Sequence, residues 1–171
     1  MNIILLGNSG CGKTSAIKKI LRQFDEPVYG YWTEKLVPDE DGTCPVVLHG
    51  TMEPLTFQHL IGSCKDHHSK RYPAVFDDAG VKFLSDIPEG SLVLMDEIGF
   101  MENDAEKFKK AVFRLLDGNY RVIAAVRDKE TELLSRIRNH PKSLCIPAES
   151  VRTDESVLHC AAVLRGEKDL L

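Results

Sequence analysis

The chain has 171 residues, of which 43% are hydrophobic, and this content is enough to bury one core, so we expect a single domain over residues 1–171. Lysine and arginine total 22 against 26 acidic residues, and the net charge of −4 gives no electrostatic reason to expect a nucleic acid or an anionic membrane as partner. No apolar run approaches the ~20 residues of a membrane span, no signal peptide is evident, and five irregularly spaced cysteines do not indicate a disulfide framework; we expect a cytoplasmic protein.

The first motif follows directly on the apolar run 3–6 and predicts a phosphate-binding loop. Its residues are Gly7, Asn8, Ser9, Gly10, Cys11, Gly12, Lys13 and Thr14, followed by Ser15. The spacing is G-x-x-x-x-G-K-[ST], in which the glycines let backbone N–H groups turn inward around an anion. We expect Lys13 to reach the β- and γ-phosphates of a nucleoside triphosphate and the Thr14 hydroxyl to ligate a bridging Mg²⁺ ion. A chance glycine-rich turn is the alternative, but the strand and helix that flank the motif favour the phosphate loop.

The next two elements are a helix and a β-hairpin. Apolar residues repeat at helical spacing from Ile17 to Phe24, and Pro27 ends the run. Two runs rich in aromatic and β-branched residues flank the turn segment 38–42 and predict an antiparallel hairpin over about residues 28–50. Such a hairpin, inserted into a chain of alternating strands and helices, is typical of antiparallel strands that extend a parallel sheet.

The segment after the hairpin is the least regular part of the chain. Its few apolar residues allow one short strand within 55–61, and the polar residues 63–71 predict an exposed loop. A further strand over 72–76 and a short helix over 77–85 are expected before the next motif.

Three potential metal ligands, Cys64, His67 and His68, lie within that polar loop. No fourth ligand stands at zinc spacing. The cluster is therefore more typical of a solvated loop than of a metal site.

The second motif is the apolar run 91–95, which ends in Asp96 and Glu97. A continuous apolar run indicates a strand buried on both faces, whose carboxyl end meets the ligand. We expect Asp96 to hold the Mg²⁺ ion through water and Glu97 to orient or deprotonate a water molecule that attacks the γ-phosphate. The alternative is a pair of solvated acids at the end of a strand. The phosphate loop favours the functional interpretation, because it implies a bound cation for the acids to serve.

The remainder of the chain alternates regularly. Asn103 and Glu106 have the spacing of a capping box at the start of a helix that Gly118 closes. The later elements are a strand over 120–126, a helix over 130–139, a strand over 143–146 and a helix over 154–165. This alternation predicts an α/β fold with a mostly parallel sheet that helices cover on both faces, and with the ligand at the carboxyl ends of the strands.

Five segments together resemble the thermophilic nucleoside-triphosphatase family, which includes the human cancer-related nucleoside-triphosphatase. They are GNSGCGKT, YGYWTEK, LMDEIGFMEN, AAVRD and an arginine, Arg152, before the last helix; the DEIG-x-ME part, residues 96–102, is the most specific. The resemblance implies a RecA-like phosphate-loop fold and Mg²⁺-dependent hydrolysis of ATP, GTP and other nucleoside triphosphates with little base preference.

The resemblance also implies roles for two arginines. It places the strand that ends at Val126 between the two motif strands, so Arg127 would lie beside the γ-phosphate, and Arg152 matches a second arginine of the family. Arg127 directly follows a buried strand at the edge where the phosphates are expected, and could stabilise transition-state charge as an arginine finger does; the alternative for both is an ordinary surface arginine. Phe100 stands where the family usually has lysine.

Three activities remain compatible with these residues. The first is a nucleoside-triphosphatase that transfers the γ-phosphoryl group to water, with Glu97 and Lys13 as central residues. The second is a small-molecule kinase, which needs an acceptor pocket and a mobile arginine-bearing lid; Arg136 and Arg138 lie on a predicted helix and suit a lid poorly. The third is a nucleotide-gated switch module. Glu97 favours hydrolysis over the kinase but does not separate an enzyme from a switch.

Overall fold

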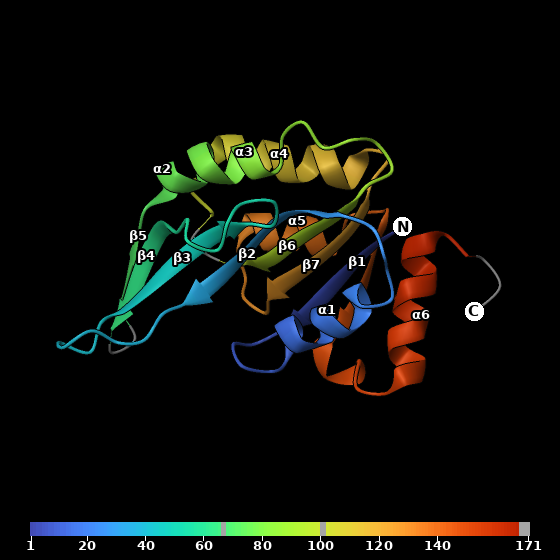
Figure 1. The fold of residues 1–171 in the computed structure, drawn as a ribbon, viewed down its shortest axis with the longest axis horizontal. Helices are drawn as coiled ribbons and strands as arrows, with labels where there is room; N and C mark the ends of the chain where they lie inside the picture. Colours follow the sequence, from blue (N-terminus) through green and yellow to red (C-terminus); the bar gives the residue numbers. More distant parts are fainter. Residues whose placement is uncertain (66–67, 100–101, 168–171) are drawn as a thin grey trace.

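The computed structural model describes residues 1–65, 68–99 and 102–167, and the strands of these residues form one sheet of eight (Figure 1). The strands are β1 (Asn2–Gly7), β2 (Val28–Lys35), β3 (Cys44–Gly50), β4 (His59–Lys65), β5 (His68–Arg71), β6 (Leu92–Ile98), β7 (Arg121–Arg127) and β8 (Ser143–Pro147). Their order across the sheet is β5-β4-β3-β2-β6-β7-β1-β8. His67, a potential metal ligand, and Phe100, which stands where the family usually has lysine, lie outside the described residues.

The central strands β2, β6, β7, β1 and β8 are parallel. The middle three of them, β6, β7 and β1, are mostly apolar, as is usual for strands that helices cover on both faces of the sheet; Leu5, for example, pairs with Ala125, and both are fully buried. β7 lies between β1 and β6, as the family resemblance predicted. The carboxyl ends of β1, β7 and β6 therefore lie side by side, and these are the ends that carry the two motifs and Arg127.

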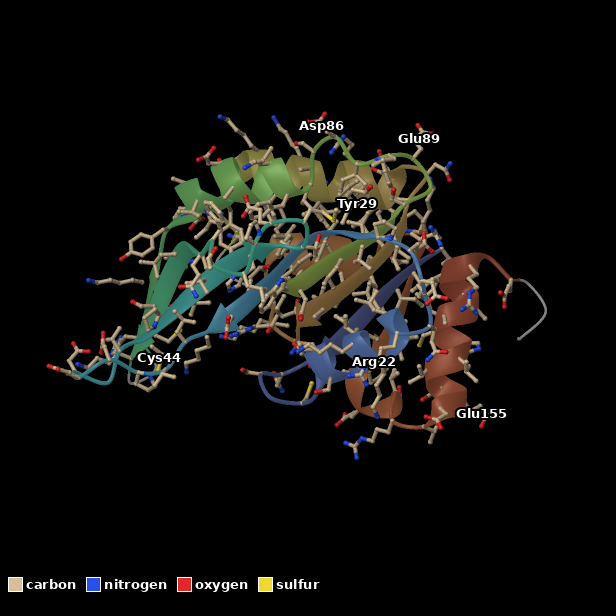
Figure 2. All side chains as sticks on the ribbon, viewed as in Figure 1. Arg22, Tyr29, Cys44, Asp86, Glu89 and Glu155 are labelled. Atoms are coloured by element: carbon tan, nitrogen blue, oxygen red, sulfur yellow. The ribbon has the colours of Figure 1, made fainter. Side chains whose placement is uncertain are left out.

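The remaining strands extend the sheet in antiparallel fashion. The predicted hairpin is confirmed as the β2–β3 pair, and Cys44, at the start of β3, marks the far end of this extension in Figure 2. Gly30 is required where β2 passes β6, because it has φ 106° and a Cβ there would collide with the carbonyl oxygen of Leu94. β4 pairs with β3, and β5 pairs with β4, both in antiparallel fashion. The prediction of an exposed loop over 63–71 is therefore wrong. Backbone pairing across the sheet, rather than an apolar pattern of their own, holds these polar residues in strands.

One face of the sheet is covered by α4 (Glu106–Asp117), α5 (Glu132–Arg138) and a helical segment that comprises α2 (Pro73–Val75), a π-helical turn (Phe76–Gly80) and α3 (Val81–Phe83). The other face is covered by α1 (Lys13–Leu21) and α6 (Asp154–Arg165), and a 3₁₀ turn (Ala148–Ser150) precedes α6. Figure 1 shows the two layers above and below the sheet. Among the described residues, no helix has the length and apolarity needed to cross a membrane.

Two expectations for the first of these layers are wrong. The strand expected over 72–76 is the start of a helix, because Pro73 occupies its first turn and Phe76 is fully buried against Phe108, with ring centroids 5.1 Å apart. The capping box of Asn103 and Glu106 does not form, since α4 begins at Glu106 after Ala105. The side chain of Asp77, from the neighbouring helical segment, accepts the backbone N–H of Phe108 at 2.9 Å instead.

Candidate active site

The phosphate loop connects β1 to α1 at the carboxyl edge of the sheet (Figure 1). Gly12 stands directly before α1 with φ 101°, a left-handed conformation in which glycine avoids the strain of a side chain. Cys11 packs against the core between the sheet and α1, and its N–H donates to the carbonyl of Asn8 at 3.3 Å. α1 therefore starts with its N–H groups and positive dipole end at the loop, as an anion site requires.

The side chain of Lys13 is 4% exposed and turns back over the loop. Its Nζ donates to the carbonyl oxygens of Gly7 at 2.7 Å and of Asn8 at 2.8 Å. The same atom lies 3.5 Å from Oε1 of Glu97. The ammonium group is thus held where the loop and the carboxyl end of β6 meet.

Thr14 and Asp96 are brought together from α1 and β6. The Thr14 hydroxyl donates to Oδ1 of Asp96 at 3.3 Å, and Asp96 is 3% exposed. The pKa of Asp96 is raised to about 6, chiefly by burial and to a smaller extent by the charge of Glu97, while the Thr14 hydrogen bond opposes the shift. Two oxygen ligands beside a phosphate loop suit Mg²⁺, which uses one or two protein ligands together with substrate phosphates.

Glu97 lies between two cations. Nε of Arg127, at the end of β7, donates to Oε1 of Glu97 at 2.6 Å, and Lys13 approaches the same oxygen. Glu97 also lines a cavity of about 210 Å³ together with residues of the loop. The loop residues that line it are Gly10, Gly12, Lys13, Thr14 and Ser15. Most of the predicted site thus converges on one space at the carboxyl edge of the sheet.

Arg152 does not join this cluster. It is exposed in the short segment between the 3₁₀ turn and α6, beyond the carboxyl end of β8. No hydrogen bond or ion pair connects it to Glu97 or to the described residues of the loop. It follows β8, the neighbour of β1, at the same edge of the sheet, but among the described residues it has no contact of the kind that Arg127 makes.

Cys64 and His68 do not form a metal centre within the described residues. Both belong to the β4–β5 pair, where Cys64 faces Ser69 and His68 faces Lys65. Among the residues that the structure describes, no group of three or more His, Cys, Asp or Glu side chains could hold a metal ion.

Sequence reasoning assigned no role to Glu102, the last residue of the DEIG-x-ME segment. Its carboxylate is 3% exposed, and Oε2 accepts the N–H of Gly99 at 2.9 Å. The pKa of Glu102 is raised to about 7, chiefly by burial and to a smaller extent by the charge of Glu97, while the hydrogen bond from Gly99 and the charge of Arg127 oppose the shift. In the sequence, the place of Glu102 in the DEIG-x-ME segment is the signal that could have drawn attention to this buried carboxyl group.

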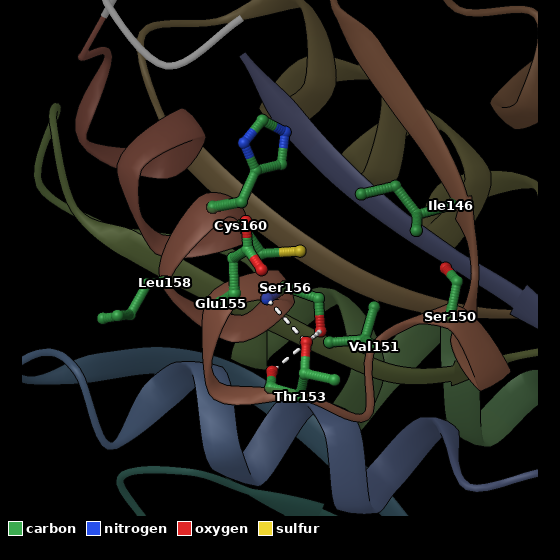
Figure 3. A pocket seen from close by; sticks show the side chains of 9 residues that line it. Ile146, Ser150, Val151, Thr153, Glu155, Ser156, Leu158 and Cys160 are labelled. Carbon is green, nitrogen blue, oxygen red and sulfur yellow. Dashed lines mark hydrogen bonds between the residues drawn. The ribbon is translucent and has the colours of Figure 1, made fainter.

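A second, larger cavity lies elsewhere, between β8 and α6 (Figure 3). Its volume is about 770 Å³, and its lining residues are Ile146, Ser150, Val151, Thr153, Glu155, Ser156, Leu158, His159 and Cys160. Thr153 caps α6 at this point, because its hydroxyl oxygen accepts the N–H of Ser156 at 3.2 Å. No residue of the predicted site lines this cavity.

Known proteins are similar to this chain in sequence, and one solved structure is similar to it in fold. The model of a family described as NTPase matches residues 2–150. Nucleoside-triphosphatase THEP1 of Thermotoga maritima is 28% identical over 176 residues, which cover 98% of this chain and 99% of that protein. THEP1 of Aquifex aeolicus is 26% identical over 163 residues, covering 85% of this chain and 89% of that protein. The crystal structure of THEP1 from Aquifex aeolicus matches with a TM-score of 0.75 at 21% identity, covering 98% of this chain and all of the other, and so shares its fold. With its phosphate loop and its DEIG-x-ME segment, the chain belongs to the NTPase family.

Proposed function

We propose that the protein hydrolyses nucleoside triphosphates, ATP and GTP among them, to the diphosphate and phosphate in a Mg²⁺-dependent reaction with little base selectivity. The observation that carries the proposal is the position of Glu97, which shares one cavity with the phosphate loop and contacts both Lys13 and Arg127. The curated relatives, which are named nucleoside-triphosphatases, support the same activity.

The phosphate loop would hold the substrate. Backbone N–H groups at the start of α1 face the bound phosphates, and Lys13 exchanges the carbonyl oxygens of Gly7 and Asn8 for phosphate oxygens. Thr14 and Asp96 are the residues that would hold Mg²⁺, Asp96 through water. When bound, the ion would supply positive charge that offsets the negative charge of the phosphate oxygens.

Glu97 and Arg127 would carry out the hydrolytic step. Glu97 orients a water molecule and accepts its proton as the water oxygen bonds to the γ-phosphorus, and the bond between this phosphorus and the oxygen bridging to the diphosphate breaks. Arg127 leaves Oε1 of Glu97 and donates to the γ-phosphate oxygens, on which charge develops. Arg152, on the same edge of the sheet, is the second candidate for this task. The proton finally leaves Glu97 with the phosphate product or to solvent.

Replacement of Glu97 by glutamine tests the proposal. Glu97→Gln retains the size of the side chain but removes the base, so Mg²⁺ and ATP should still bind while phosphate release falls by about 10²-fold or more. Asp96→Asn should weaken Mg²⁺–nucleotide binding and activity together. Glu40→Gln, on the exposed turn between β2 and β3, is the matched control and should leave both unchanged.

The assay is phosphate release from a panel of triphosphates, with and without candidate acceptors, together with nucleotide binding by calorimetry. A Glu97→Gln variant that releases phosphate as fast as the parent would refute the proposed base. Acceptor-dependent transfer that outpaces hydrolysis would identify a kinase instead.

A further inference from the structure

Glu97 lies at an irregularity in the sheet, and this raises the question of what fixes its side chain. In the β6–β7 ladder Asp96 faces Ala125 and Ile98 faces Val126, so Glu97 is an additional residue with no partner of its own in the register. Such a bulge re-aims a side chain but removes the regular pairing that would hold it. The orientation of Glu97 therefore depends on side-chain partners, of which Arg127 is the closer at 2.6 Å.

Arg127 in turn lies against the backbone of Gly99. A Cβ atom at Gly99 would come within 3.2 Å of Cδ and 3.5 Å of Nε of Arg127, and Nε is the atom that donates to Glu97. The path of the backbone at Gly99 thus limits where the guanidinium group can lie. A shift of the backbone at Gly99 would therefore displace the guanidinium group and its hydrogen bond to Glu97.

Glu102 holds the backbone at Gly99. Its Oε2 accepts the N–H of Gly99 at 2.9 Å, and the acceptor is almost completely buried, so its removal leaves this N–H without its partner in the protein. Glu102, Gly99, Arg127 and Glu97 also line one small cavity of about 30 Å³, together with Thr33 of β2, Val46 of β3 and Ile61 of β4. These four residues therefore lie close together beside the site.

We propose that Glu102 is a positioning residue for hydrolysis: through the N–H of Gly99 it holds the backbone against which Arg127 packs, and so keeps the guanidinium group beside Glu97 and the phosphate loop, from where it reaches the γ-phosphate. This inference rests on the proposed function of Glu97. The charged and titratable groups that surround Glu102 are Glu97, Arg127 and the buried hydroxyl of Tyr31. Because burial raises the pKa of Glu102, a large fraction of its carboxyl group is neutral near pH ~7. The N–H of Gly99 therefore requires an acceptor oxygen rather than a negative charge.

The test compares two substitutions of Glu102. Glu102→Ala removes the acceptor, and we expect kcat to fall about 10- to 100-fold, the usual effect of losing a group that orients an active-site residue, while KM for Mg²⁺–ATP changes less than about threefold. Glu102→Gln retains an acceptor oxygen and should keep kcat within about threefold of the parent. Glu106→Ala, an exposed acid at the start of α4, is the control and should match the parent.

A double-mutant cycle with Arg127→Ala tests the path of the effect. If Glu102 acts through Arg127, adding Glu102→Ala to Arg127→Ala should lower kcat by less than about threefold, since the group that it positions is already absent. Additive losses would overturn the inference, as would a Glu102→Ala variant with the kcat of the parent or a Glu102→Gln variant as impaired as Glu102→Ala. ATP binding by calorimetry verifies that each variant is folded. Should Glu102→Ala not fold, the comparison of Glu102→Gln with the shorter Glu102→Asp replaces it. We expect Glu102→Asp to have a lower kcat and Glu102→Gln to retain the kcat of the parent.

The result is distinguishable from a failure of the proposed function. If Glu97→Gln abolishes hydrolysis while Glu102→Ala does not lower it, only the positioning role is refuted. If Glu97→Gln hydrolyses ATP at the rate of the parent, the proposed function fails first, and the positioning role of Glu102 fails with it.

Discussion

The buried carboxyl of Glu102 should make the stability of the nucleotide-free, metal-free protein depend on pH. Its pKa is raised from the usual 4.5 to about 7, so between these values the folded state binds more protons than the unfolded state. Stability therefore falls as the pH rises through this window, because the folded state must ionise a buried group. The pKa of Glu102 is higher by about 2.5 in the folded state, which at ~1.36 kcal/mol per pH unit lowers the free energy of unfolding by about 3 kcal/mol over the whole window. About 2 kcal/mol of this loss falls between pH ~5 and ~8.

The measurement is urea unfolding of the parent and of Glu102→Gln at both ends of that range, with chelator and without nucleotide. Asp96, whose pKa is also raised, lowers the stability of both proteins in the same direction, so the difference between them isolates Glu102. The free energy of unfolding of the parent should fall by about 2 kcal/mol more than that of Glu102→Gln as the pH rises. Equal pH dependence in the two proteins would show that Glu102 is not a buried carboxyl of raised pKa.

Three further outcomes are expected. Arg127→Ala should lower kcat on the order of 10³-fold with little change in nucleotide affinity, measured by steady-state kinetics and calorimetry; activity within a few-fold of the parent would make Arg152 the next candidate. ATP, GTP, CTP and UTP should compete with affinities within about 100-fold, or ~2.7 kcal/mol, and a larger preference would direct attention to the cavity between β8 and α6 as a base pocket. Asp77→Ala should destabilise the fold by about 1 kcal/mol in urea unfolding, as loss of a helix cap does, whereas Asn103→Ala should have no such effect.

The parts of the site that the sequence predicted are those whose position follows from local pattern. The phosphate loop needs only a strand before it, glycines at fixed places and a helix after it, and all three can be recognised along the chain. The proximity of Thr14 to Asp96 follows from a second rule, that parallel strands bring their carboxyl ends to one edge of the sheet. The position of Arg127 required the family resemblance as well, since the residues alone do not give the strand order.

The parts that sequence reasoning missed depend on partners distant in the chain. The start of β4 overlaps the short strand expected within 55–61, whereas its polar second half and β5 are strands because they pair with β3 and with each other. The N–H of Phe108 is capped by Asp77, 31 residues earlier, whereas the local capping box suggested by Asn103 does not form. Such interactions leave no periodic signal, so composition and spacing could not reveal them.

The position of Glu97 depends both on local sequence pattern and on contacts with residues distant in the chain. The sequence identifies it as a carboxylate beside the acid that is expected to hold the metal, but the proposed use of Glu97 as a base depends on where its side chain points. That orientation is set by the bulge in β6 and by the contacts to Lys13 and Arg127. Both cations engage the same oxygen, so a bound triphosphate, which carries more negative charge than one carboxylate, would draw them away from Glu97. The exchange would free a lone pair of Glu97 for water only after the phosphates are in place. If these residues act as proposed, the ion-pair cluster would couple substrate binding to activation of the base, and the orientation of Arg127, with the backbone of Gly99 that Glu102 holds, would be a condition of hydrolysis rather than a detail of packing.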